Sequence, residues 1–294
     1  MTASNAQVPP PDRSAVEEGE VHDALLRTGA LTDDQAQLVA EQQARDGGNF
    51  DSAAVALALA TEDDVILARQ ALQGQRAFDL SPATEISDEI VVLSDPVGPQ
   101  AEALRLLRTQ IIAQHIGAGR RAFAVTAATD GSGKTFVAAN LAVALSQVGI
   151  KTLLIDANLR NPRVDQVFGI DPNGPGLSTY LTMQANRPER VIYSDVLPNL
   201  AVVPSGPPVA RPQELLSGAR FRVGVDILLR QYDVAIFDTP AANENADALT
   251  VAAVLGYALV VARRDQAYFR DVQALAQQLS AARATVIGSV LNEF

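Results

Sequence analysis

Short apolar runs and helical patterns alternate along the last two thirds of the chain. The runs are short and almost wholly apolar, which predicts strands buried on both faces rather than helices. These strands are expected at 122–125, 151–155, 200–203, 232–238, 257–262 and 285–291. Helical patterns fall between them, over 101–116, from 134 onwards, over 247–255 and over 268–282. The alternation predicts an α/β fold with a doubly wound, mostly parallel sheet.

The first third of the chain has a different pattern. Residues 1–19 are rich in proline, serine and acids, which predicts a disordered tail. Over 20–80, a weak repeat starts at Ala24 and again at Ala53, and predicts a small domain of two helical hairpins. Thr32 with Gln35, and Thr61 with Asp64, are expected to cap helices in the two copies. A linker is expected over 81–98 and the α/β domain over 99–294.

Composition and charge argue against several classes of function. The chain has 294 residues, 48% of them hydrophobic, which suffices for one large domain and one small one. The net charge of −11 argues against binding nucleic acid or anionic membranes through bulk electrostatics. With no cysteine and only His22 and His115, a structural zinc site is not expected. We see no signal peptide, and the longest apolar run, 248–262, is shorter than the roughly 20 residues of a membrane span, so we expect a soluble protein.

A glycine-rich loop joins the strand at 122–125 to the helix that begins at Lys134. Strand, glycine loop, Gly-Lys-Thr and helix in this order predict a P-loop. Gly131 and Gly133 would let backbone N–H groups point at phosphate oxygens, where the helix N-terminus adds partial positive charge. Lys134 would reach the β- and γ-phosphates and the Thr135 hydroxyl would bind Mg²⁺. No Asn-Lys-x-Asp follows a strand, so we expect ATP rather than GTP.

Two further strands end in an acid. Asp156 closes the run at 151–155, and Asp238 closes the run at 232–238. Ligands of an open parallel sheet bind outside the carboxyl ends of its strands, so both acids are expected beside the P-loop. An apolar run closed by Asp is the Walker B pattern, whose carboxylate holds Mg²⁺. Asn158 and Arg160 lie just beyond Asp156.

Three segments together resemble the Walker A, A′ and B motifs of bacterial tyrosine autokinases, the P-loop kinases of capsule and exopolysaccharide export. They are 126–135 (TAATDGSGKT), 154–160 (LIDANLR) and 236–240 (IFDTP). Glu102, Arg105 and Arg108 match the oligomerisation motif of that family, and 197–216 also resembles it. From about residue 95 to the end, the chain is similar to chain-length determinant tyrosine kinases of the EpsG type. Thr129 stands where the related partitioning ATPases have a signature lysine.

The resemblance implies an ATP- and Mg²⁺-dependent protein-tyrosine kinase. It implies that Lys134, Asp156 and Asp238 are catalytic and that Thr135, Asp156 and Asp238 hold the metal. The implied nucleotide contacts are Thr129, Asp130, Gly131, Ser132, Gly133, Lys134, Thr135, Phe136, Asn158 and Asn292. It further implies a homo-oligomeric ring through Glu102, Arg105 and Arg108. The implied partner is a membrane chain-length determinant protein, which would hold the kinase at the cytoplasmic face of the membrane.

The predicted helical domain resembles the front domain of secretion and pilus assembly ATPases. Some of those domains bind a cyclic dinucleotide through Arg-Leu-Gly at the start of each repeat. Here the corresponding stretches are Val-His-Asp (21–23) and Asn-Phe-Asp (49–51), which favours a docking module over a nucleotide sensor.

Two departures from the kinase pattern leave an alternative open. The second acid of Walker A′ is Asn158, whose amide cannot accept a proton. The chain also ends at Phe294 without the tyrosine-rich tail of the family, and its tyrosines are Tyr180, Tyr193, Tyr232, Tyr257 and Tyr268. We expect Tyr232 and Tyr257 to pack beside strands and the other three to be accessible. The alternative is an ATP-binding switch or scaffold without tyrosine transfer; a third interpretation, a partitioning-type ATPase, is disfavoured by the acidic charge.

Overall fold

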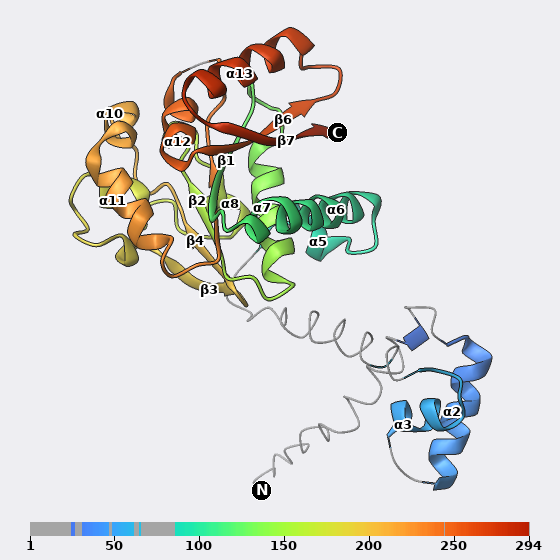
Figure 1. Ribbon diagram of the computed structural model, residues 1–294. Coiled ribbons are helices and arrows are strands. Elements are labelled where there is room, and N and C mark those ends of the chain that lie inside the picture. Colours follow the sequence, from blue (N-terminus) through green and yellow to red (C-terminus); the bar gives the residue numbers. More distant parts are fainter. Residues whose placement is uncertain are drawn as a thin grey trace, which may run out of the picture. The chain divides into compact units, whose positions relative to one another are not determined.

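The computed structural model describes residues 25–26, 31–46, 49–61, 65, 86–243 and 245–293. The chain divides into two compact units, Met1–Asp79 and Leu80–Phe294 (Figure 1). Within the described part of the chain, no helix combines the length and the apolarity needed to cross a membrane.

The first unit has a small apolar core around helices α2 (Asp33–Asp46) and α3 (Phe50–Ala56). Its buried members are Leu25, Leu31, Ala36, Val39, Phe50, Ala54 and Ala60. The capping box at Thr32 is confirmed: the Thr32 N–H donates to Gln35 Oε1 at 2.9 Å, and the Gln35 N–H donates to Thr32 Oγ1 at 3.4 Å. Asp64 and residues 21–23 lie outside the described residues. In residues 49–51, the second stretch that corresponds to the Arg-Leu-Gly of ligand-binding domains, Phe50 is a core residue, so its side chain is not presented to a ligand.

The second unit is built on a seven-stranded sheet in the order β3-β4-β2-β5-β1-β6-β7. The strands are β1 (Ala122–Thr126), β2 (Thr152–Asp156), β3 (Tyr193–Leu197), β4 (Leu200–Val203), β5 (Val234–Asp238), β6 (Tyr257–Arg263) and β7 (Thr285–Asn292). Every pairing is parallel except that of β3 with β4. The α/β class and the mostly parallel sheet are therefore confirmed.

Helices cover both faces of this sheet (Figure 1). On one face α7 (Lys134–Ser146) packs on β1, β2, β4 and β5, and is itself covered by α5 (Val91–Ser94) and α6 (Pro99–Gln114). This double covering explains why α7 is buried on nearly all sides. The other face carries α11 (Ala219–Leu228), α12 (Asp247–Leu255) and α13 (Phe269–Ala281), whose apolar side chains share one core with the strands.

The proline- and glycine-rich region 171–218 contains more structure than the sequence predicted. Besides β4 it forms α9 (Leu177–Leu181), the 3-10 helix η2 (Pro188–Val191), β3 and α10 (Pro212–Ser217). These elements are too short for a periodic pattern, and β3 exists through its antiparallel pairing with β4. Another short helix, α8 (Val164–Val167), follows β2.

Residues 86–98 fall within the predicted linker and pack against the rest of the second unit. The Ser87 N–H donates to the Val167 carbonyl at 2.9 Å. The buried side chain of Asn140 on α7 donates to the Glu89 carbonyl at 2.8 Å and accepts from the Val92 N–H at 3.3 Å. This segment is therefore tied to the helix that follows the P-loop.

Candidate active site

The P-loop runs from the end of β1 to the start of α7. Gly131 and Gly133 have φ of 68° and 84°, the left-handed region that side chains disfavour. Ser132 Oγ donates to the Thr129 carbonyl at 2.7 Å, which closes the loop on itself. Lys134, only 5% exposed, places its Nζ 3.3 Å from Asp130 Oδ1.

The two predicted acids meet beside this loop. Asp156 and Asp238 are register partners at the ends of β2 and β5, and both are fully buried. Thr135 Oγ1, the first-turn hydroxyl of α7, donates to Asp238 Oδ2 at 2.6 Å. Asp238 Oδ1 is buried and has no hydrogen-bond partner among the residues that the structure describes.

Asp156 organises the loop that follows β2. Its Oδ1 accepts from the Asn158 N–H at 2.9 Å, and its Oδ2 accepts from the N–H groups of Arg163 and Val164 at 3.1 Å each. Burial first, and then the charge of Asp238, raise the pKa of Asp156 well above its usual range, and these N–H groups oppose the rise.

Burial also raises the pKa of Asp238, to about 6. The hydrogen bond from Thr135 and the positive charges of Lys134 and Arg163 oppose that rise. A buried, unpartnered carboxylate oxygen next to a hydroxyl and a second acid offers the hard oxygen ligands that Mg²⁺ prefers. The residues present therefore fit a magnesium ion, with Thr135, Asp156 and Asp238 as the groups that would hold it.

A cavity of about 510 Å³ opens in front of the P-loop. Seven of the predicted nucleotide contacts line it: Asp130, Gly131, Gly133, Lys134, Thr135, Phe136 and Asn158. Thr129 and Ser132 belong to the loop but do not line the cavity. Arg160, Arg163 and Asp165 also line it, so three cations, counting Lys134, and two acids, counting Asp130, border the cavity.

The ends of β6 and β7 support the P-loop from another side. Asn292 Nδ2 donates to the Ser132 carbonyl and Arg263 Nη1 to the Gly131 carbonyl, each at 3.2 Å. Because Arg263 and Asn292 are register partners on β6 and β7, the two contacts form a pair. Asn292 therefore lies against the P-loop, and Arg263 is a supporting residue that no sequence motif marked.

Asn158 is engaged on both sides of its amide. Its Nδ2 donates to the Asn161 carbonyl at 2.7 Å, and its Oδ1 accepts from the Asn161 N–H at 3.2 Å. An aspartate could not supply the first of these hydrogen bonds. In this chain the residue therefore shapes the loop after Asp156.

Two ion pairs beside the cavity were not predicted. Arg160 Nε lies 2.7 Å from Oδ2 of the fully buried Asp247, the first residue of α12. Arg163 Nη2 lies 2.7 Å from Glu89 Oε1. Arg160 was already notable for its position after Asp156, whereas Glu89 and Asp247 belong to no motif and are recognised only in three dimensions.

Known proteins resemble this chain in sequence and in fold. Residues 120–285, more than half of the chain, match the family described as AAA domain. The tyrosine-protein kinase YwqD of Bacillus subtilis is 30% identical over 203 residues, which make up 69% of this chain and 85% of YwqD. The chain belongs to the family of bacterial tyrosine-protein kinases.

Other similar proteins match over different shares of their length. EpsB of Ralstonia solanacearum is 36% identical over 198 residues, 67% of this chain but 26% of EpsB. The chain thus spans about a quarter of that relative. The kinase domain of the Escherichia coli tyrosine kinase ETK aligns with a TM-score of 0.65 at 31% identity, covering 69% of this chain and 79% of that domain. The septum site-determining protein MinD of Pyrococcus horikoshii, complexed with Mg-ADP, aligns with a TM-score of 0.51 at 25% identity, covering 58% and 70%.

The motif implied by the kinase resemblance to mediate oligomerisation lies on α6. Arg105 donates through Nε to Glu102 Oε2 at 2.9 Å and through Nη1 to the Pro96 carbonyl at 2.7 Å. Arg108 Nη1 is 3.4 Å from the Ala144 carbonyl of α7, and burial together with the charge of Arg105 lowers its pKa. Arg105 and Arg108 are therefore partly engaged within the subunit, and Glu102 is the most exposed of the three residues.

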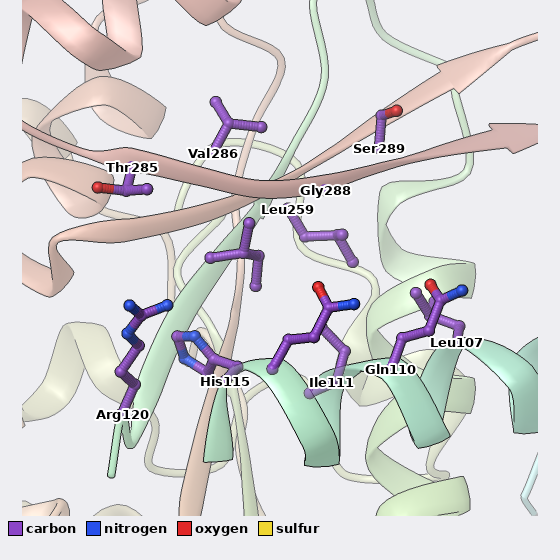
Figure 2. A pocket seen from close by; sticks show the side chains of 12 residues that line it. Leu107, Gln110, Ile111, His115, Arg120, Leu259, Thr285, Val286, Gly288 and Ser289 are labelled. Carbon is purple, nitrogen blue, oxygen red and sulfur yellow. The ribbon is translucent and has the colours of Figure 1, made fainter. Parts of the chain in front are cut away.

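Further along α6, a second cavity of about 210 Å³ separates the helix from β6 and β7. Figure 2 shows His115, Ile111 and Gln110 on the helix side and Leu259 and Gly288 on the strand side. It shares no lining residue with the P-loop cavity. His115 itself packs edge-on against Phe123 and Tyr257, so we assign this histidine to packing.

The tyrosines of this kinase-family chain differ in accessibility. The expectation that Tyr180 is accessible was wrong: it is 3% exposed, its hydroxyl donates to the Arg220 carbonyl, and the Arg220 guanidinium covers its ring. The short helix α9 turns this side chain into the core, which its loop-like sequence context did not reveal. Tyr193 is half-buried on the edge strand β3, and Tyr268, at the start of α13, is 66% exposed.

Proposed function

We propose that this chain is an ATP-dependent protein-tyrosine kinase of the P-loop type, which acts with a membrane chain-length determinant protein in exopolysaccharide production. The observation that carries the proposal is the hydrogen bond between Thr135 and Asp238, made beside Asp156 at the P-loop. Family membership supports a tyrosine as the acceptor.

Each residue then has a defined task. The P-loop backbone and Lys134 would bind the β- and γ-phosphates, and Thr135 with the two acids would hold Mg²⁺, whose charge offsets that of the phosphates when it is bound. The tyrosine oxygen would form a bond to the γ-phosphorus as the bond to the ADP oxygen breaks. Asp156, at the end of β2 beside the site, would help to position the tyrosine hydroxyl for in-line attack.

A second candidate is favoured by Asn158. Its amide is committed to Asn161, so the loop lacks the second acid of the kinase pattern. With that acid missing, the same nucleotide site would serve an ATP-binding switch or scaffold that controls assembly of the export machinery.

Assembly and location are part of the proposal. Glu102, Arg105 and Arg108 would contribute to a subunit interface in a ring, and the partner would hold the protein at the cytoplasmic face of the membrane. Residues 20–80 would form a docking domain, joined to the ATPase domain at 99–294. Asn292 would contact adenine from its place beside the P-loop.

One experiment separates kinase from switch. The purified chain is incubated with Mg-ATP and the cytoplasmic segment of the partner, and phosphotyrosine is mapped by mass spectrometry. Phosphotyrosine that disappears in Lys134→Ala supports the kinase. ATP-dependent assembly without phosphotyrosine would instead support the switch, and absence of ATP binding would refute both.

A further inference from the structure

Arg163 and Glu89 form an ion pair at the rim of the P-loop cavity. Their side chains are 49% and 45% exposed, and Arg163 Nη2 lies 2.7 Å from Glu89 Oε1. Arg163 lines the cavity together with Lys134, and its charge acts on the Asp238 carboxyl. The guanidinium is therefore within electrostatic reach of the metal and phosphate site.

Arg160 and Arg163 differ in how firmly each is held. Arg160 is bound to Asp247, and its departure would leave a fully buried carboxylate without a counter-charge. Glu89 is half in water and would be hydrated if Arg163 left it. A phosphate carries more charge than one carboxylate and matches the fork of a guanidinium, so it can displace Glu89.

The backbones of both partners are fixed, so an exchange needs side-chain movement only. Asn140 on α7 holds the Glu89 carbonyl at 2.8 Å. The Arg163 N–H is bound to Asp156 Oδ2 at 3.1 Å. The ion pair thus joins two segments that are each anchored to the nucleotide site, one through the P-loop helix and the other through the Asp156 loop.

We propose that Arg163 binds the terminal phosphate of the nucleoside triphosphate and that Glu89 competes with this phosphate for the guanidinium. The inference rests on the proposed nucleotide site and adds a residue that distinguishes a triphosphate from a diphosphate. It also assigns to Glu89 a function opposite to that of its partner, since Glu89 would weaken triphosphate binding.

Calorimetric titration of the full chain with Mg-ATP and with Mg-ADP tests this assignment. Arg163→Ala should weaken ATP binding about tenfold or more, as expected for loss of a charged hydrogen bond, and change ADP binding less than about twofold. Glu89→Gln should strengthen ATP binding by about two- to fivefold and leave ADP binding unchanged. Arg163→Lys, which keeps the charge, should fall between wild type and Arg163→Ala.

The matched control is Arg211→Ala. Arg211 is in an exposed ion pair with Glu214 and does not line the cavity, so its loss should leave both affinities unchanged. A purely structural pair would make Arg163→Ala and Glu89→Gln shift ATP and ADP binding in the same direction, and that result would overturn the inference alone. Wild-type protein that binds neither nucleotide would overturn the proposed function and the inference with it.

Discussion

Asp156 and Asp238 lie opposite each other in register on the adjacent parallel strands β2 and β5, and both carboxyl groups are completely buried. Two like charges in such a place are unfavourable without a counter-ion, and burial raises both pKa values. The arrangement is costly to the fold and suited to a divalent cation.

Removing one of these charges should change how stability depends on pH. The folded-state pKa of Asp238 is about 6, above the roughly 4 of an unfolded aspartate. The folded state therefore favours the protonated form of Asp238. The stability that this preference gives to the fold is fully present below about pH 4 and is lost as the pH rises through 6. Without Mg²⁺, the free energy of unfolding of Asp238→Asn should rise relative to that of wild type by on the order of 2 kcal/mol between pH 4 and pH 7.5.

Urea unfolding in EDTA at several pH values measures this difference. The asparagine variant retains an acceptor for Thr135. It also removes the charge that raises the pKa of Asp156, so the measured difference includes the response of that neighbouring acid. A difference between the two proteins that does not vary with pH would contradict the prediction.

The Thr135 hydroxyl should matter for the metal-bound nucleotide in particular. Thr135→Val keeps the shape but removes the donor to Asp238 and the proposed metal ligand. We expect Mg-ADP affinity to fall by about 10- to 100-fold, equivalent to roughly 1.4–3 kcal/mol, and ADP affinity in EDTA to fall much less. Thr135→Ser should restore most of the affinity. Equal losses with and without Mg²⁺ would remove Thr135 from the metal site.

Replacing Asn158 with the aspartate of the kinase pattern should not improve the active site. Asn158→Asp would replace the donor to the Asn161 carbonyl with a carboxylate oxygen at 2.7 Å. We expect the free energy of unfolding to fall by about 1–3 kcal/mol, with no gain in phosphotyrosine formation. Asn158→Ala, which removes the repulsion, serves as the control. Higher kinase activity in the aspartate variant would show that the loop can rearrange.

The ion pair between Arg160 and Asp247 should stabilise the fold mainly by neutralising the buried acid. Arg160→Ala leaves Asp247 buried and unpaired, so we expect a loss of about 2 kcal/mol in the free energy of unfolding. The double variant with Asp247→Ala should recover part of this loss. Denaturant unfolding of the four proteins in a mutant cycle measures the coupling, and additive losses would contradict a direct interaction.

The sequence by itself determined the elements and the P-loop, because their signals are local. The apolar run before residue 126, the glycines at 131 and 133 and the helix beginning at Lys134 are adjacent in the chain, and their order specifies strand, phosphate loop and helix. Asp156 and Asp238 were also recognised, since parallel strands end at a common edge and each acid closes an apolar run.

Only the tertiary structure decided which side chains meet. Thr135 and Asp238 are 103 residues apart in the chain, and Arg163 and Glu89 are 74 apart, so no local pattern links them. Tyr180 has the sequence context of an exposed loop, yet the packing of α9 buries it. Periodicity and propensity act over one or two turns of chain, whereas burial, ion pairing and pKa depend on neighbours that the folded sheet brings together.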